Sequence, residues 1–252
     1  MVRFTKRGFP LVLFALSLVA CSTHLVATKQ EYKQYKIDNE IQPDSTYIRY
    51  YQPYKQQLDA EMNRVIGHTD VTLTHPRSEP ETLLGNFFAE ALLTEGRRVH
   101  SDVDFSFGTK GGLRIELQKG DITVGHLFEL MPFENELVVL ELSAAHVQQL
   151  AQFIASTNGQ PIAGMCMQIS NGQATDIRIG GEPLNLSRTY KLLTYDYIAN
   201  GGDHVRGLDD PVSRTDLGIK VREALMEYVG QQTRAHNYIT TQLDGRITSS
   251  YQ

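Results

Sequence analysis

The sequence has only two cysteines, no tryptophan and no apolar run long enough to span a bilayer comfortably. Two thiols cannot by themselves build a disulfide framework or a cysteine-rich metal site. Positive charge is also in short supply, because 24 Lys and Arg face 29 Asp and Glu, a formal net charge of −5. A nucleic-acid-binding protein needs a basic surface to neutralise phosphates, so this balance argues against binding to DNA or RNA.

The rest of the composition is that of a folded protein. Hydrophobic residues make up 41% of the 252 positions, and a chain of this length can form one large or two small domains with a substantial core. Ordinary apolar content and a modest net charge exclude disorder as the main state of the chain.

The first 21 residues have the pattern of an export signal. Three basic residues precede an apolar run over residues 9–20, which is shorter than a membrane-spanning helix and ends directly at Cys21. Small residues that lead into a cysteine resemble the bacterial lipoprotein signal, which implies that Cys21 becomes a lipidated N-terminus. We therefore expect an exported protein, lipid-anchored to a bacterial membrane on its periplasmic side or at the cell surface. The alternative is an ordinary cleavable signal in which Cys21 has no role.

The pattern divides the chain into a lipoprotein signal over 1–21, a polar tether over 22–44 and one domain over 45–252. Within the domain, apolar spacings of three and four predict helices, and strict alternation predicts strands. A turn is expected at Gly120-Asp121 and a hairpin at Asn171-Gly172. The irregular order of elements predicts an α+β fold, a single domain with a mixed β-sheet and packed helices. Helices are expected over 53–66, 83–93, 124–130, 144–155 and 217–229, and strands over 71–74, 103–107, 113–117, 137–142, 165–169, 175–179 and 190–197.

Three loops combine glycine or proline with polar or aromatic side chains, and binding sites are usually built on such loops. Paired glycines allow a ligand to approach the backbone closely, and an arginine beside them offers a planar fork for phosphate or carboxylate. Taken singly, each loop has an ordinary structural explanation, as a tight turn or as an aromatic side chain that packs into the core. The loops are Gly111-Gly112-Leu113-Arg114, Pro132-Phe133-Glu134-Asn135, and Tyr197 with Asn200-Gly201-Gly202-Asp203.

The order and spacing of these loops, with the residues between them, resemble the C-terminal, substrate-binding domain of the 5′-nucleotidase family. That family also includes UDP-sugar hydrolases and 2′,3′-cyclic phosphodiesterases. The resemblance extends over about residues 45–250 and is carried by PYKQQLDAEMNRVIG, SEPETLLGNFFAEALL, GGLRIELQKGDITVGHLFELMPFENELVVLELSAAHVQQL and YKLLTYDYIANGGDHV.

The resemblance implies that two charged side chains hold the polar part of a nucleotide. Arg114 matches the arginine that contacts the phosphate, and Gly111 and Gly112 belong to the same motif. Asp203 matches a carboxylate that accepts hydrogen bonds from the ribose hydroxyls, a suitable role because a carboxylate only accepts. Arg77 lies close to the place of a second phosphate arginine in the family.

The resemblance also implies an aromatic sandwich around the base. Phe133 and Tyr197 match the two stacking side chains, and Asn135 matches a polar contact nearby. Stacking of a base on an aromatic ring contributes about 1–3 kcal/mol per base in single-strand binders and tolerates different bases.

The sequence departs from many relatives at four of these positions. Thr109 replaces an asparagine, and Lys110 replaces a glycine, where its charge either adds to the phosphate site or is solvated. Glu134 also replaces a glycine, and its charge weakens the binding of an anion unless the side chain points away. Tyr197 replaces a phenylalanine, which preserves the stacking area and adds a hydroxyl.

The catalytic half of such an enzyme is missing from the pattern. In the family a separate metallophosphatase domain holds two metal ions and activates the attacking water, and its Asp-x-His, Gly-Asn-His-Asp/Glu and Gly-His-x-His motifs do not occur here. The eight histidines are scattered, and no two lie within four positions of each other. We therefore expect no catalytic residue, metal or cofactor in this chain, with divalent metal ions held by a partner protein.

The favoured hypothesis is thus one half of a split, exported 5′-nucleotidase or phosphoesterase. This chain would bind base and ribose, help to hold the phosphate, and be inactive without a separately encoded metallophosphatase. A membrane-tethered lipoprotein that captures nucleotides or nucleosides without a hydrolase partner is the alternative from another class. A degenerate structural domain and an independent enzyme with an unrecognised site are the remaining, weaker hypotheses.

Overall fold

The computed structural model describes residues 29–250, so the expected signal and Cys21 lie outside the described residues. The chain divides into two units, Met1–Ile48 and Arg49–Gln252. In the first unit, residues 29–44 form no helix or strand. Asp44 then caps helix α2 (Ser45–Met62), because its carboxylate accepts hydrogen bonds from the N–H groups of the second and third residues that follow.

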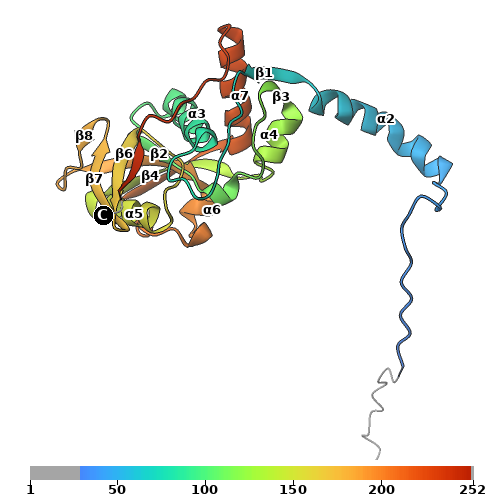
Figure 1. Cartoon of the computed structure of the whole chain (residues 1–252), viewed down its shortest axis with the longest axis horizontal. Coiled ribbons are helices and arrows are strands. Elements are labelled where there is room, and N and C mark those ends of the chain that lie inside the picture. The colour runs from blue at the N-terminus through green and yellow to red at the C-terminus, as the bar shows by residue number, and fades with distance from the viewer. Residues whose placement is uncertain (1–28, 251–252) are drawn as a thin grey trace, which may run out of the picture. The chain divides into compact units, whose positions relative to one another are not determined.

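The second unit is built around a mixed five-stranded sheet in the order β10-β4-β9-β2-β5. The pair β9–β2 is parallel and the other three pairs are antiparallel. Helix α3 (Leu83–Val99) packs against β2, β5 and β9, and α5 (Ala144–Ser156) contacts β4 and β9 (Figure 1). The strands are β2 (Phe105–Phe107), β4 (Glu136–Ser143), β5 (Ile162–Ala163), β9 (Thr189–Tyr195) and β10 (Ser213–Lys220).

Two smaller sheets complete the unit. One pairs β1 (Val65–Thr69) with β3 (Gly120–Thr123), and the other has the order β11-β6-β7-β8. Asn171 and Gly172 join β6 to β7 with φ of 49° and 74°, the left-handed pair that the expected hairpin requires. The four strands are β6 (Met165–Ser170), β7 (Gln173–Ile179), β8 (Glu182–Pro183) and β11 (Ile247–Ser250), and the other helices are α4 (Val124–Leu130), α6 (Asp196–Ala199) and α7 (Val221–Arg234).

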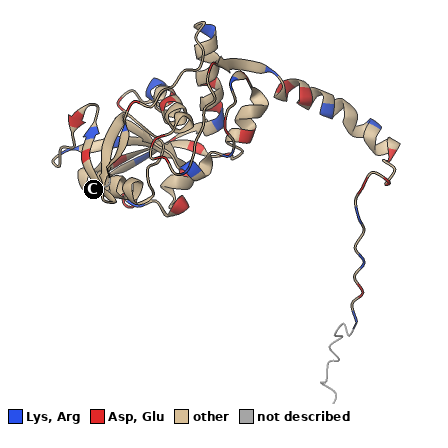
Figure 2. Cartoon of the chain, in the orientation of Figure 1, with Lys and Arg blue, Asp and Glu red and all other residues tan. Residues whose placement is uncertain are grey.

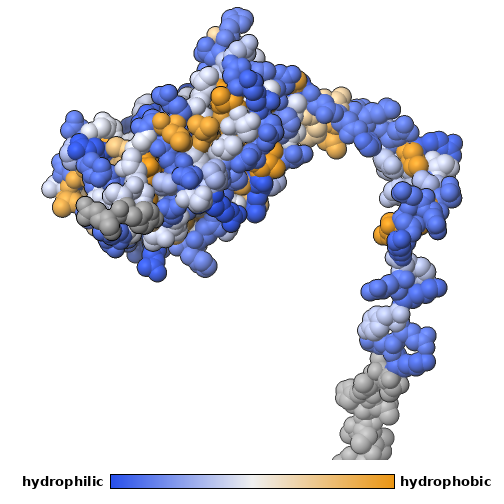
Figure 3. Space-filling model, in the orientation of Figure 1, coloured by the Kyte–Doolittle hydropathy of each residue, from blue (hydrophilic) through white to orange (hydrophobic). Residues whose placement is uncertain are grey.

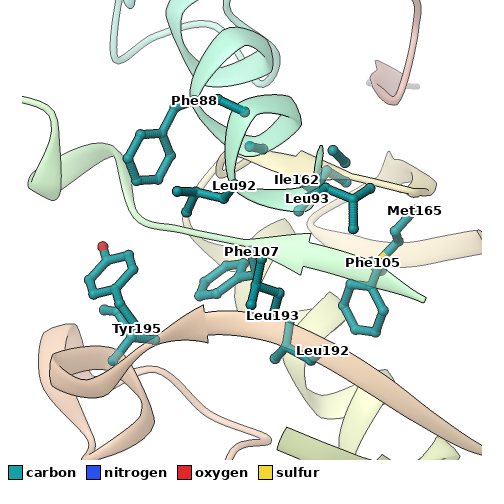
Figure 4. Close-up of a cluster of buried hydrophobic side chains, with 14 of the residues drawn as sticks. Phe88, Leu92, Leu93, Phe105, Phe107, Ile162, Met165, Leu192, Leu193 and Tyr195 are labelled. Atoms are coloured by element: carbon teal, nitrogen blue, oxygen red, sulfur yellow. The ribbon is translucent and has the colours of Figure 1, made fainter. Parts of the chain in front are cut away.

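One layer of the core lies between α3 and the central strands β2 and β9, and the buried cluster continues onto α4, α5 and α7. Figure 4 shows Phe88 and Leu92 of the helix pointing towards the sheet, and the Phe88 and Tyr195 rings meet edge to face with centroids 6.5 Å apart. Leu193 reaches Gly96 so closely that a Cβ there would lie 2.4 Å from a leucine methyl. Burial of a large side chain stabilises the fold by about 1.5–3 kcal/mol, so this layer fixes the ends of β2 and β9 firmly.

The fold is the expected α+β arrangement, but several boundaries differ from the prediction. The first helix begins at Ser45 rather than at 53 and ends at Met62, because Val65 and Ile66 belong to β1. Their spacing continues the helical pattern, but pairing with β3 determines their conformation. The last helix begins at Val221, after strand β10, rather than at 217.

The predicted strands over 71–74 and 113–117 are wrong, as is the turn at Gly120-Asp121. Leu73 and Leu117 form only an isolated bridge, whereas Gly120–Thr123 is strand β3. Alternating side chains are buried here by irregular backbone that crosses the core, and alternation alone cannot distinguish that from a strand.

The surface of the second unit carries both signs of charge. In the view of Figure 2, acidic and basic residues are interspersed over the helices and loops. Figure 3 shows apolar side chains on the same face, separated by hydrophilic ones. Among the described residues, no helix combines the length and the apolarity needed to cross a bilayer.

Candidate nucleotide-binding pocket

The three loops singled out in the sequence meet at one edge of the central sheet. Strands β2 and β9 are parallel neighbours, so the loop after Phe107 and the loop after Tyr195 leave the sheet at the same edge. Strand β4 runs antiparallel to β9, with Leu137 opposite Tyr195, so the loop that precedes β4 reaches this edge as well. Sheet topology therefore brings together segments that lie far apart in the sequence.

These loops enclose a cavity of about 200 Å³. Seven of the eight residues predicted for the binding site line it, and Arg77 does not, because its exposed side chain lies on the loop before α3. The lining residues are Thr109, Gly111, Gly112, Arg114, Met131, Phe133, Asn135, Tyr195, Tyr197 and Asp203.

On one side of the pocket, Arg114 and Phe133 line the cavity, and Glu134 and Arg222 support them from outside it; we term these four residues the cation side. The guanidinium of Arg114 lies 5.0 Å from the centroid of the Phe133 ring, a distance typical of a cation–π contact. Arg114 is exposed and the Phe133 side chain is half-buried. A planar cation and an aromatic face are thus presented together at the mouth of the cavity.

Arg222 holds the loop that carries Phe133. It is almost fully buried, and its guanidinium donates hydrogen bonds to the carbonyl oxygens of Met131 and Phe133, each at 3.2 Å. The same guanidinium lies 3.9 Å from the Phe128 ring centroid and forms an ion pair with Glu134. One side chain from α7 thereby fixes the backbone that the predicted aromatic platform depends on.

Glu134 does not line the cavity. From the sequence we expect its charge to weaken the binding of an anion unless the side chain points away. Its carboxylate accepts hydrogen bonds from Lys220 and Arg222, and these two cations lower its pKa to about 2. The negative charge of Glu134 is therefore balanced by two cations at the start of α7.

The opposite side, which we term the hydroxyl side, consists of Thr109, Tyr195, Tyr197 and Asp203. The Asp203 carboxylate accepts hydrogen bonds from the Thr109 hydroxyl at 2.5 Å and from the Tyr197 hydroxyl at 3.1 Å. Behind Thr109, the Tyr195 hydroxyl lies 3.2 Å from its Oγ1. Burial raises the pKa of Tyr195 to about 12, so its hydroxyl keeps its proton at any physiological pH.

Lys110 does not reach the pocket, and neither of the two expectations for it is right. Its ammonium donates hydrogen bonds to the carbonyl oxygens of Glu79 at 2.6 Å and Asn158 at 2.9 Å, and its side chain is buried. Burial lowers the pKa of Lys110 to about 8. The side chain links the loop before α3 and the loop after α5 to the glycine motif.

Tyr197 does not lie in the secondary structure predicted for it. The strand expected over 190–197 ends at Tyr195, and Tyr197 lies in the short helix α6 with its side chain half-exposed, at 49%. Asp203 and His204 follow with φ of 53° and 54°, a left-handed conformation that non-glycine residues adopt only at a cost. The turn after Gly201 thus returns Asp203 to the Tyr197 hydroxyl.

Sequence reasoning did not assign a binding role to Thr109, Met131 or Tyr195, which line the pocket, and it did not identify Arg222, which supports it from outside. Tyr195 ends an apolar strand and has the pattern of a core residue, and Arg222 is 88 positions from the glutamate it pairs with. No local pattern signals either contact, because only the tertiary structure creates it. Within residues 29–250, no group of three or more His, Cys, Asp and Glu is arranged to hold a metal ion.

The family model described as "5′-nucleotidase, C-terminal domain" matches residues 65–210. That match covers more than half of the chain, so the chain belongs to the 5′-nucleotidase C-terminal domain family. The matched region includes every pocket residue, from Thr109 to Asp203.

Individual relatives are distant but extend over most of this chain. A 5′-nucleotidase of Vibrio vulnificus is 25% identical over 204 residues, which cover 77% of this chain and 35% of the relative. Protein UshA of Escherichia coli is 25% identical over 75% of this chain and 35% of its own length. The chain thus spans about a third of these relatives. The crystal structure of a 5′-nucleotidase precursor from Thermus thermophilus superposes with a TM-score of 0.70 at 26% identity, covering 82% of this chain and 44% of that one.

Proposed function

We propose that this chain binds a nucleotide in the pocket and presents its phosphate to a metallophosphatase carried by a separate protein. The observation that carries the proposal is the convergence of Arg114, Phe133, Tyr197 and Asp203 on one cavity. These four side chains come from three loops and supply a planar cation, two aromatic rings and a carboxylate. Each group suits a different part of a nucleotide.

Each side chain would make its contact for a stated chemical reason. A guanidinium binds phosphate oxygens in two parallel, charge-assisted hydrogen bonds, so Arg114 takes the phosphate. The rings of Phe133 and Tyr197 stack on the two faces of the base. Asp203 accepts hydrogen bonds from the ribose, and Asn135 lies beside the base as a further polar contact.

The proposal is tested by calorimetric titration of AMP and adenosine into the purified chain and two variants. Arg114→Ala should weaken AMP about tenfold or more and change adenosine less than about twofold, because only AMP carries the phosphate. Phe133→Ala should weaken both ligands, because both carry the base. Arg77→Ala is the matched control, since that arginine is exposed and outside the pocket, and it should leave both affinities unchanged. If the wild type binds neither ligand, nucleotide binding by this chain alone is excluded.

The division of labour between two chains needs its own experiment. We expect the chain alone to hydrolyse no AMP in the presence of Mn²⁺ or Zn²⁺. Addition of an exported metallophosphatase-domain protein from the same genome should produce hydrolysis with the wild type and much less with Arg114→Ala. Strong binding without any effect of this chain on hydrolysis would favour the alternative, a lipoprotein that captures nucleotides.

We further propose that the protein is exported and anchored to a bacterial membrane through lipid on Cys21. The support for this is the basic and apolar leader of the sequence, which ends at that cysteine. Metabolic labelling with a radioactive fatty acid should mark the wild type and leave Cys21→Ala unlabelled. Labelling of both proteins, or of neither, would contradict the proposal.

A further inference from the structure

The carboxylate of Asp203 is held between hydroxyls from two other segments of the chain. Thr109, 94 positions earlier in the sequence, hydrogen-bonds to its Oδ2 at 2.5 Å, and the Tyr197 hydroxyl hydrogen-bonds to its Oδ1 at 3.1 Å. The backbone N–H of Asp203 donates to the same Tyr197 hydroxyl at 3.3 Å. Both carboxylate oxygens are therefore fixed in place by the protein before any ligand binds.

The direction of these hydrogen bonds follows from the chemistry of the groups. An ionised carboxylate only accepts, so the protons of Thr109 and Tyr197 must both point towards Asp203. The Thr109 Oγ1 then accepts a hydrogen bond from the Tyr195 hydroxyl, which in turn accepts one from the Thr109 backbone N–H at 3.4 Å. Thr109 and Tyr195 are both buried, so no water competes strongly for this chain of donors.

The arrangement leaves each carboxylate oxygen one remaining site for a donor. A carboxylate has about four lone-pair sites, two on each oxygen, and the protein occupies one on each. Asp203 itself is exposed and lines the cavity, so the other two sites are open to a ligand. Two adjacent acceptors of this kind match two adjacent hydroxyls on a ligand.

We propose that Thr109 and Tyr197 are positioning residues that orient the Asp203 carboxylate towards a vicinal diol and so make the pocket selective for ribose over a 2′,3′-dideoxy sugar. This inference rests on the proposed function, since it concerns the sugar of the same nucleotide. Thr109 acts through Asp203, whereas the Tyr197 ring also stacks on the base. The hydroxyl of Tyr197 thereby couples the orientation of the aromatic ring to that of the carboxylate.

The experiment measures the affinities of adenosine and 2′,3′-dideoxyadenosine for the purified chain by calorimetry. The wild type should prefer adenosine about tenfold or more, since two hydrogen bonds to a charged group distinguish the ligands. Thr109→Val keeps the shape of the side chain and removes the hydroxyl, and it should reduce this preference about fivefold. Tyr197→Phe keeps the stacking ring and should reduce the preference by a similar factor. Neither substitution should change the affinity for the dideoxynucleoside more than about twofold.

A conservative variant and two controls separate positioning from mere stability. Thr109→Ser restores the hydroxyl and should recover the preference of the wild type. Thr175→Val and Tyr190→Phe remove hydroxyls that bond to backbone groups outside the pocket, and they should leave the preference unchanged. Equal weakening of both nucleosides by Thr109→Val, or failure of Thr109→Ser to restore the preference, would overturn the inference.

The experiment gives one result if the inference alone is wrong and another if the proposed function is wrong as well. A wild type that binds both nucleosides with equal affinity contradicts the inference alone. A wild type that binds neither contradicts both.

Discussion

The two sides of the pocket are stabilised by different kinds of interaction. On the hydroxyl side, neutral donors supported by the buried Tyr195 hold Asp203. On the cation side, Arg222 from a distant helix holds the Phe133 loop and is partnered by the exposed carboxylate of Glu134. The Tyr195–Thr109 hydrogen bond is neutral and buried and responds little to salt, whereas the exposed carboxylate of Glu134 makes ion pairs that are screened and titrate. The hydroxyl side should therefore respond less to salt than the cation side.

Loss of Arg222 should have the largest effect on stability. Arg222→Met leaves the carbonyl oxygens of Met131 and Phe133 without their donor, and we expect the free energy of unfolding to fall by about 2–3 kcal/mol. Urea denaturation measures this change. Arg234→Met is the matched control on the same helix, since that arginine makes an exposed ion pair, and it should cost no more than about 0.5 kcal/mol. Equal losses in the two variants would show that Arg222 does not anchor the loop.

Loss of the Tyr195 hydroxyl should be the next largest effect. Tyr195→Phe removes a buried partner of Thr109 and should lower the free energy of unfolding by about 1–2 kcal/mol. It should also weaken the affinity for adenosine, because the Thr109 hydroxyl loses its donor. Tyr190→Phe removes a hydroxyl of β9 that accepts the backbone N–H of Asn185 in the preceding loop, so it should lower stability by no more than Tyr195→Phe and leave the affinity unchanged. An unchanged adenosine affinity in Tyr195→Phe would show that the buried Tyr195 hydroxyl does not support the hydroxyl side.

Substitutions at two neighbouring glycines test whether the affinity for adenosine depends on the position of the Tyr197 ring. A Cβ at Gly202 would lie 2.5 Å from both the Tyr197 ring and the Tyr197 carbonyl oxygen, so Gly202→Ala should displace Tyr197 and weaken the affinity for adenosine about fivefold. Gly201 has open space around it but a φ of 89°, so Gly201→Ala should cost about 1 kcal/mol of stability without displacing the ring. Calorimetry and thermal unfolding distinguish the two variants. If both weaken adenosine equally, backbone strain rather than ring position controls binding.

The smallest expected effect is a pH dependence on the cation side. Lys220 and Arg222 lower the pKa of Glu134 from 4.5 to about 2, so its stabilising contribution is present above about pH 4.5 and lost as the pH falls towards 2. The difference in unfolding free energy between the wild type and Glu134→Gln should therefore shrink over this window. High salt should reduce the same difference at neutral pH. A constant difference from pH 6 to pH 2 would contradict this account of the pair.

Much of the site could be predicted because the order and spacing of three loops resemble those of a known family, although each loop taken singly has an ordinary structural explanation. The glycine-arginine loop, the Phe133 loop and the turn before Asp203 each follow a recognisable element, and all three line the cavity. Prediction failed where the role of a residue depends on partners that are distant in the sequence. Lys110 looked like a phosphate ligand or a solvated charge, and its buried contacts with Glu79 and Asn158 are not local in the sequence.

The sequence by itself determined the class of fold, most of the helices and strands, and the chemical groups available for binding. These properties follow from apolar periodicity, turn residues and local motifs, which act over a few positions. Only the tertiary structure decided that Val65 and Ile66 form a strand, that Glu134 turns away from the pocket, and that Thr109 meets Asp203. Such outcomes depend on parallel pairing of β2 with β9 and on packing of α7, which bring together groups about 90 residues apart.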